Sequence, residues 1–297
     1  MKLYNFSIIL FLFFANHSGE KNEKSIATTP VWKVGQTKDY HISVTTEYYQ
    51  NNYFGTGGYY TSDIKMKILA ATEKSYDIEW VYKNVNVEKL TPDAAENFLV
   101  QLSEGRKVIY SVTKSGKFIK IKNLKEIRDF HTYKIDKMIA KNDQNTDLMK
   151  QMKTLFSTEK AIENLVISEI KMYHQIYGFE FNFNSETAAE IHFDNLITGV
   201  PIPANIVLKV GNINPAGNSI KIEETQKVNQ KKSKKIFEQI IKRINEYSGE
   251  DRKIKNYDIF YNLVYDYDPV STYIKSMMIT KTDIQGRFKT VHTTVFK

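Results

Sequence analysis

The residue types that carry out catalysis or bind metals are present, but their spacing specifies no reaction. Beyond the N-terminal segment the histidines are His41, His131, His174, His192 and His292, and no two of them have the i, i+4 spacing of a helical zinc pair. The chain has no cysteine, which excludes disulfides, Cys-ligated zinc or iron–sulfur sites and thiol catalysis. We therefore expect no metal site and no cofactor.

Motifs for nucleophilic catalysis and for phosphate or calcium binding are also incomplete. No Gly-x-Ser-x-Gly elbow occurs, and the repeated Ser-x-x-Lys matches are what a Lys-rich chain produces by chance. The glycine-rich stretch 55–58 is not followed by Lys-Ser/Thr. Residues 143–147 match half of a calcium loop, but Leu148 stands in place of its glycine and Thr154 in place of its closing acid. We expect no catalytic residue; a hydrolase of polysaccharide or peptide stays as an alternative, because a carboxylate pair meets only in the fold.

Tyrosines around the glycine-rich stretch are candidates for contact with a partner: Tyr48, Tyr49, Tyr53, Tyr59 and Tyr60. A tyrosine offers an apolar ring face and a polar tip, so it suits stacking on sugars or docking of another molecule. The alternative is a long hairpin whose tyrosines cover the sheet.

A lysine cluster is the second candidate contact surface, made of Lys231, Lys232, Lys234 and Lys235. It precedes an amphipathic helix expected over 236–247, and cations at a helix N-terminus oppose the helix dipole. A nearby anionic surface would explain the cluster. The alternative is a solvated loop in which Ser233 caps the helix.

The N-terminus predicts export. One lysine is followed by the apolar run 6–15 and by a small, polar exit, which is the secretory signal pattern, and we place the signal peptide at 1–18. The apolar run is shorter than the about 20 residues of a membrane-spanning helix, so we expect no transmembrane span after signal removal and a periplasmic or secreted protein. An uncleaved anchor is the alternative.

The net charge of +8 suits an acidic partner such as an anionic lipid surface. Export argues against nucleic acid as that partner. The alternative is that the lysines only keep the surface soluble.

Alternating and helical hydrophobic patterns divide the chain into strands and helices. The 19 Tyr and 17 Phe favour strands. Strands are expected at 37–50, 59–71, 76–82, 108–112, 118–121, 179–183, 189–193, 206–210, 220–226, 257–267, 273–281 and 287–296, with helices at 91–105, from 123, within 148–177 and at 236–247. The order predicts an α+β fold with a large curved antiparallel sheet and helices packed on one face. We expect one domain over 19–297, with two sheet subdomains as the alternative.

Two short motifs carry a resemblance. Trp32-x-x-Gly35 before a long meander, and the strand–turn–strand step over 111–117, make the chain similar to uncharacterised exported β-rich proteins. That resemblance implies no activity and no site residues. By layout only, the chain also resembles periplasmic lipoprotein-carrier domains, in which a curved sheet and helices hold acyl chains.

These observations favour a non-catalytic exported protein that binds an apolar or amphipathic ligand, lipid or lipoprotein-like, on a concave sheet. Ile78, Trp80 and Tyr82 share one face of the expected third strand and are the predicted ligand contacts. The alternative is an envelope or secretion accessory that acts through contacts with an envelope protein.

Overall fold

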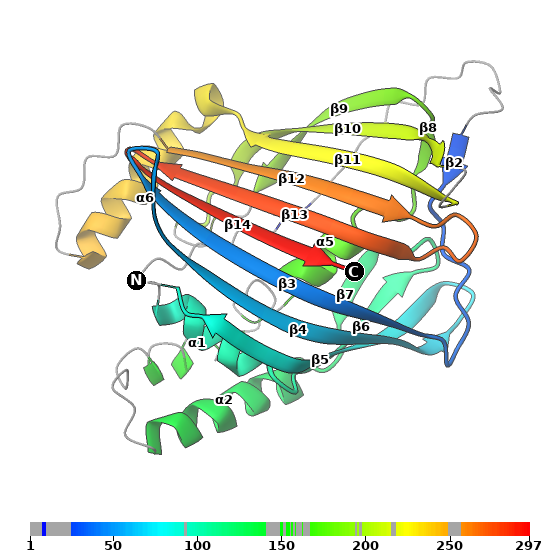
Figure 1. The fold of residues 1–297 in the computed structure, drawn as a ribbon, viewed down its shortest axis with the longest axis horizontal. Helices are drawn as coiled ribbons and strands as arrows, with labels where there is room; N and C mark the ends of the chain where they lie inside the picture. Colours follow the sequence, from blue (N-terminus) through cyan, green and yellow to red (C-terminus); the bar gives the residue numbers. More distant parts are fainter. Residues whose placement is uncertain are drawn as a thin grey trace. The chain divides into compact units, whose positions relative to one another are not determined.

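The structure is a computed structural model that describes residues 8–9, 25–91, 94–140, 149–150, 153–154, 156, 158, 162, 167–193, 195, 198–214, 218–248 and 257–297 (Figure 1). The chain forms two compact units. Unit 1 comprises residues 1–5, 29–43 and 59–178, and unit 2 comprises residues 6–28, 44–58 and 179–297. The long strands β3 (Thr37–Gln50) and β4 (Tyr53–Ala71) contribute residues to both units.

Unit 1 contains a sheet in the order β3-β4-β5-β6-β7, with β5 (Ser75–Lys89), β6 (Lys107–Thr113) and β7 (Phe118–Ile121). Its helices are α1 (Ala94–Ser103), α2 (Leu124–Ala140) and α5 (Ser168–His174). The pairs β4–β5, β5–β6 and β6–β7 are antiparallel. Alternate side chains of β3 to β6 are buried, and Tyr173 of α5 packs on this buried face against Tyr40 and Trp80.

Unit 2 contains an antiparallel sheet of β9 (Ser185–Phe193), β10 (Ile202–Asn214), β11 (Ser219–Val228), β12 (Tyr257–Tyr267), β13 (Ile274–Gln285) and β14 (Phe288–Phe296). Helix α6 (Gln230–Ser248) connects β11 to β12. Two short strands, β2 (Ser25–Ala27) and β8 (Glu180–Asn182), pair with each other. The tip of the β3–β4 hairpin lies beside β14, where the Asn51 backbone N–H donates to the Arg287 carbonyl at 2.9 Å.

The predicted α+β class and the large antiparallel sheet are confirmed, and the strands follow the period-two pattern closely. One local expectation is wrong: the sequence predicts that the second strand begins at residue 59, but β4 begins at Tyr53 and includes the glycine-rich stretch 55–58. The turn lies earlier, at Asn51 and Asn52, whose φ angles are 51° and 67°. Two adjacent residues with positive φ match the tight turns that suit hairpins, and asparagine tolerates this conformation better than most residues do.

Several sequence expectations fall on residues outside the described ranges. The signal peptide at 1–18 is one, apart from β1 (Ile8–Ile9), which pairs with Phe193 and His192 of β9. The partial calcium loop at 143–147 also lies there, as do residues 148, 151–152, 155, 157, 159–161 and 163–166 of the helical stretch 148–177. The single domain over 19–297 stays a prediction. Within the described part of the chain, no helix has both the length and the apolarity that crossing a membrane requires.

Candidate functional site

The predicted ligand contacts Ile78, Trp80 and Tyr82 lie in one row on the buried face of β5, and all three are buried. The Tyr173 ring of α5 meets the Trp80 ring edge-on, with centroids 5.5 Å apart. Tyr40 stacks on Trp80 from β3, with centroids 6.4 Å apart. These contacts place the row in the core of unit 1, under α5. Its role in ligand contact stays a prediction.

Polar groups in this part of unit 1 hydrogen-bond to one another. The Tyr40 and Tyr173 hydroxyls are 2.8 Å apart, and the Tyr82 hydroxyl donates to Glu169 at 2.8 Å. His174 Nδ1 lies 2.9 Å from the Gly116 carbonyl, which only accepts, so Nδ1 carries the proton and Nε2 accepts from the Tyr110 hydroxyl at 2.9 Å. Such mutual bonding is what a stable buried core requires.

The pKa values of this cluster reflect its burial. Desolvation lowers the pKa of His174 to about 3, although its bond to the Gly116 carbonyl acts in the opposite direction. The pKa of Tyr110 is raised well above its usual value, first by burial and then by Tyr173 and Tyr82. His174 and Tyr110 are therefore neutral around neutral pH, and their hydrogen bond holds α5 on the sheet.

A different arrangement occurs on the buried face of unit 2. Strand pairing sets Gln226 of β11 opposite Tyr261 of β12, Tyr261 opposite Lys281 of β13, and Lys281 opposite His292 of β14. Directly paired residues share a face, so these side chains form one row across the sheet. His292 Nδ1 extends the row to β3, where it lies 3.1 Å from the Thr46 hydroxyl.

Two acidic side chains join this row. Glu224 accepts a hydrogen bond from the Gln226 amide on the same strand. Asp283 lies 2.8 Å from the Lys281 ammonium, and both partners of this ion pair are nearly buried. We name Glu224, Gln226, Tyr261, Lys281, Asp283 and His292 the polar row.

Burial strongly affects the titration of the polar row. Desolvation raises the pKa of Glu224 to about 7, and the hydrogen bond from Gln226 only partly opposes this. Burial raises the pKa of Tyr261 to about 12, while Lys281 lowers it and Asp283 raises it further. Strongly shifted groups that lie together are typical of functional sites, although structural networks also produce them.

Hydrogen bonding in the polar row is incomplete. Gln226 Oε1 and Asp283 Oδ1 are buried and have no hydrogen-bond partner among the residues that the structure describes. Their neighbours on the same face are apolar: Leu208, Leu263 and Ile279 lie in the adjacent row of direct strand partners around Glu224. The row is buried at Gln226 and half-buried at His292. It thus combines an aliphatic surface with unmet acceptors, and it approaches solvent at β14.

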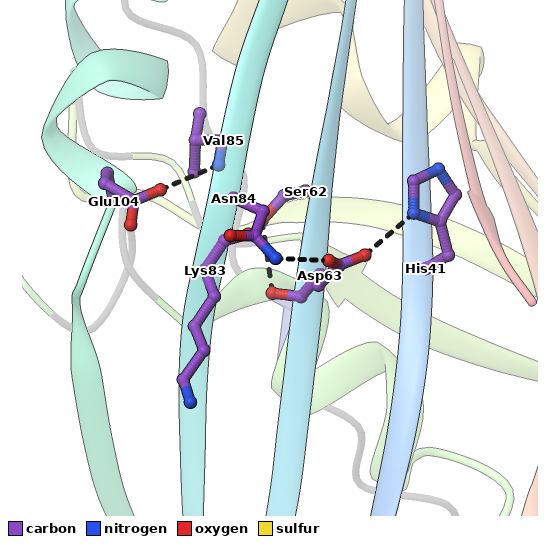
Figure 2. Close-up of polar contacts among 7 residues, drawn as sticks. All are labelled: His41, Ser62, Asp63, Lys83, Asn84, Val85 and Glu104. Carbon is purple, nitrogen blue, oxygen red and sulfur yellow. Dashed lines mark hydrogen bonds and ion pairs between the residues drawn. The ribbon is translucent and has the colours of Figure 1, made fainter.

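An exposed polar cluster lies on unit 1, as Figure 2 shows. His41 Nδ1 is 2.8 Å from Asp63, and the Asn84 amide donates to the other oxygen of Asp63 at 2.7 Å. The hydrogen bond from Asn84, followed by that from His41, lowers the pKa of Asp63. The β4–β5 register is irregular at this point, between Thr61 and Asp63.

Among the residues that the structure describes, no hydroxyl group is hydrogen-bonded to His41 or to the Asp63 carboxylate. The adjacent Ser62 is buried, and its hydroxyl donates to the Lys83 carbonyl at 3.1 Å (Figure 2). Nearby, Glu104 accepts the Val85 N–H at 2.7 Å, which is a structural bond. In the part of the chain that the structure describes, no three His, Asp or Glu side chains are grouped to hold a metal ion. The cluster thus has a base and an orienting acid but no reacting group.

The predicted contact tyrosines divide between the units. Tyr48, Tyr49 and Tyr53 lie at the hairpin tip in unit 2, with Tyr53 largely exposed to solvent. Tyr59 and Tyr60 are half-buried in unit 1, where they pair with Lys89 and Val87 of β5.

The predicted lysine cluster lies inside α6 rather than before it, because the helix begins at Gln230. Asn229 caps the helix by accepting the Lys232 N–H at 3.1 Å. Ser233 is instead buried and donates to the Pro203 carbonyl, so the alternative of a Ser233 cap is wrong. Lys232 forms an ion pair with Glu190, while Lys231, Lys234 and Lys235 are exposed.

Sequence reasoning missed the polar row. A signal was present: on β11 the period that buries Ile220, Ile222 and Val228 also buries Glu224 and Gln226. Two polar residues in the apolar phase of a strand indicate a buried polar site or a strand that is covered on neither face.

Comparison with protein families and with curated proteins finds no match. The resemblance to uncharacterised exported β-rich proteins therefore stays a prediction. Among solved structures, the chain is similar to one titled "Lipid-protein interactions in lipovitellin", with 11% sequence identity and a TM-score of 0.40 over 89% of this chain. The match spans 25% of that protein. A likeness at this level carries no argument about fold or function.

Proposed function

We propose that this protein is an exported, non-catalytic carrier that binds a lipid-like amphipathic molecule on the buried face of the unit 2 sheet. The observation that carries the proposal is the polar row, where Gln226 Oε1 and Asp283 Oδ1 lack partners among the described residues on an otherwise mostly apolar face. Buried acceptors without partners are rare in folded proteins, and each calls for a water, an ion or a ligand.

Energetics support an amphipathic occupant. An unmet buried acceptor costs about 1–3 kcal/mol, which a donating head group would recover. Apolar ligand surface contributes about 25 cal/mol per Å², so roughly 300 Å² of acyl chain against residues such as Leu263 and Ile279 would contribute roughly 7 kcal/mol before the entropic cost of binding. The two terms together favour a molecule with one chain and a small polar head.

The chemistry of the row indicates which head group fits. Lys281 already pairs with Asp283, and Glu224 is protonated below about pH 7. The remaining capacity is for hydrogen-bond donors, since both unmet atoms are acceptors. We therefore expect a hydroxyl or ammonium head group, as in a monoacylglycerol or an ethanolamine lipid, rather than a free carboxylate.

The predicted contacts on β5 enter the proposal as a second location. Ile78, Trp80 and Tyr82 are packed against β3 and α5 side chains, so a ligand would reach them only after α5 moved away. Binding there would change when Trp80 is altered, whereas binding at the polar row would not.

The first experiment is native mass spectrometry of the mature protein, purified from its own envelope without detergent. We expect a retained mass of lipid size. Gln226→Leu should lose that mass, because it removes the row's amide while keeping the side chain's bulk. Glu223→Gln is the matched control, since Glu223 lies on the same strand but on the exposed face, beside Lys221.

A lipid-binding titration distinguishes the polar row from β5 as the binding site. After removal of lipid, the wild-type chain should bind a monoacylglycerol, and Gln226→Leu should bind it at least about tenfold more weakly, which corresponds to the loss of one buried hydrogen bond. Equal binding by both proteins would overturn the polar row as the site. If Trp80→Phe then altered the binding, the site would be on β5. A wild-type chain that neither retains nor binds lipid would overturn the carrier function and favour an accessory that contacts proteins.

A further inference from the structure

Two hairpin tips of unit 2 form an exposed aromatic surface. The β3–β4 tip carries Tyr53 and Phe54, which are 80% and 56% exposed, and the β13–β14 tip carries Phe288, which is 43% exposed. The tips are joined by the hydrogen bond from Asn51 N–H to the Arg287 carbonyl at 2.9 Å. Three large aromatic side chains in contact with water on neighbouring turns are unusual for a soluble surface.

Local contacts hold these rings outward rather than folding them into the core. The Phe54 ring meets Tyr49 edge-on, with centroids 5.7 Å apart. Lys289 Nζ lies 5.1 Å from the Tyr49 ring centroid, and the Arg287 guanidinium lies 5.1 Å from that of Phe288. Each exposed ring cluster is thus accompanied by a cation.

The lysines of α6 lie at the same end of the unit 2 sheet. Tyr257, the first residue of β12, pairs with Gln285 beside the β13–β14 turn. Helix α6 packs on this residue, because the Phe237 ring lies 4.6 Å from the Tyr257 ring and the Gln230 amide donates to the Tyr257 carbonyl at 2.9 Å. Figure 1 shows α6 and the β3–β4 turn together at this end, on the left of the view.

These α6 lysines carry uncompensated charge. Lys232 is paired with Glu190, but no ion pair joins Lys231, Lys234 or Lys235 to any residue that the structure describes. Asp258 faces Lys227 at 3.9 Å, Glu47 accepts the Tyr49 hydroxyl, and Glu238 lies one turn further along the helix. We name Tyr53, Phe54, Arg287, Phe288, Lys231, Lys234 and Lys235 the aromatic–basic end.

We infer that the aromatic–basic end docks on the surface of an anionic lipid bilayer. Aromatic side chains favour the head-group region of a membrane, where an apolar ring and a polar edge are both accommodated. Lysines near an anionic leaflet each contribute about 1 kcal/mol of attraction. The aromatic rings and the lysines come from different elements of unit 2, so two independent features indicate the same occupant. The inference goes beyond the proposed function, because docking requires no ligand in the polar row.

Vesicle sedimentation of the full-length mature chain tests the inference. The wild-type protein should sediment with phosphatidylcholine vesicles that contain phosphatidylglycerol, and hardly at all with phosphatidylcholine alone. The variant K231Q/K234Q/K235Q should bind the anionic vesicles at least about tenfold more weakly, with a smaller dependence on salt. The matched control is K65Q/K67Q/K120Q, which removes the same charge from exposed lysines of unit 1 and should bind like the wild type.

The aromatic contribution is tested separately with Y53S/F54S/F288S, which exchanges exposed rings and should leave the fold intact. This variant should also lose at least about tenfold in binding, yet keep the salt dependence of the wild type. Wild-type binding by both triple variants, or no sedimentation of the wild type with anionic vesicles, would overturn the inference. If the chain bound envelope proteins but not lipid vesicles, the same surface would be assigned to a protein partner instead.

The experiments distinguish failure of membrane docking from failure of the carrier function. Gln226→Leu should lose the retained lipid mass but sediment normally with vesicles. The two triple variants should keep a lipid mass that is already bound but sediment poorly. A single variant that loses both properties would show a folding defect, which far-ultraviolet circular dichroism would detect.

Discussion

Each unit has a cluster of buried polar side chains on its sheet, under α5 in unit 1 and in the polar row of unit 2, and the two clusters differ in how completely they are hydrogen-bonded. Under α5 in unit 1, the Tyr40, Tyr110 and Tyr82 hydroxyls each have a hydrogen-bond partner within the protein, and His174 uses both ring nitrogens. In the polar row of unit 2, Gln226 and Asp283 each keep an acceptor without one. A completed network indicates a structural core, whereas an incomplete one on an apolar face indicates a place for another molecule.

The stability of the two regions should also change with pH in opposite directions. In unit 1 burial lowers the pKa of His174 and of His131 to about 3. In unit 2 burial raises the pKa of Glu224 to about 7. Acid therefore lowers the stability of the unit 1 region, because these histidines bind protons in the unfolded state but not in the folded state. Rising pH weakens the second, because the unfolded state releases a proton that the folded state retains.

The largest effect should come from the core of unit 1. Trp80→Ala should lower the free energy of unfolding of this unit by about 3–5 kcal/mol, since it removes a wholly buried indole that Tyr40 and Tyr173 contact. Both tryptophans of the chain lie in unit 1, so the fluorescence of the remaining Trp32 reports its urea unfolding. A loss below about 1 kcal/mol would show that the Trp80 site is loosely packed, and it would favour β5 as the ligand site.

The next largest effect on stability should come from Glu224→Gln. The folded-state pKa of Glu224, about 7, lies above the ordinary 4.5, so its contribution to stability is fully present below pH 4.5 and is lost as the pH rises through 7. At about 1.4 kcal/mol per pH unit, Glu224→Gln should raise the stability of unit 2 by about 3 kcal/mol at pH 8 and hardly change it at pH 4. Hydrogen exchange of the β11 and β12 peptides measures this, with Glu223→Gln as the control. A gain that is equal at both pH values would contradict the raised pKa.

The opposite pH dependence of stability is expected for His131 in unit 1. This side chain is buried and stacks on Phe156 with centroids 4.4 Å apart, and neither of its nitrogens has a hydrogen-bond partner in the described part of the chain. Burial, followed by Arg106 and Lys134, lowers its pKa to about 3, so stability is present above pH 6.5 and lost as the pH falls toward 3. His131→Phe should therefore exceed the wild type by about 2 kcal/mol at pH 5 and match it at pH 8.

Tryptophan fluorescence during urea unfolding at the two pH values checks this result. His192→Phe, at an exposed position of β9, is the control and should show no such pH dependence in unit 1. If His131→Phe lost stability at pH 5, a hydrogen bond of His131 in the folded state would be implied, and the contrast between the two regions would weaken.

The sequence predicts the strands and the fold class because period-two burial is a local property. The Lys114–Lys117 hairpin also follows from its composition, and Gly116 there has the positive φ of 91° that the turn requires. The polar row is not local. Gln226, Tyr261 and Lys281 lie on three strands, and only the pairing register sets them opposite one another. Likewise, the Asn51–Asn52 turn places Gly57 within a strand, where an added Cβ would lie 3.0 Å from the Thr46 carbonyl oxygen.

A smaller effect should follow from a single hydrogen bond in the unit 1 core. Tyr110→Phe removes the hydroxyl that donates to His174 Nε2 and leaves that nitrogen buried without a partner. The unfolding free energy of unit 1 should fall by about 1–2 kcal/mol, as measured by tryptophan fluorescence. The double variant Tyr110→Phe with His174→Phe should recover part of this loss, because it removes both partners. No recovery would mean that the bond from His174 to the Gly116 carbonyl matters more than the one to Tyr110.

The smallest effect on stability is expected for the exposed His41–Asp63 pair on unit 1. This pair tests whether a hydrogen-bonded polar pair contributes to stability when it is exposed rather than buried. His41 and Asp63 have side chains that are 57% and 46% exposed, so water screens their interaction. His41→Ala should change the unfolding free energy by less than about 0.5 kcal/mol and leave lipid retention unchanged. A measurable hydrolytic activity of the wild type that His41→Ala abolished would contradict this expectation. It would assign chemistry to the His41–Asp63–Asn84 cluster and favour the hydrolase alternative over the carrier.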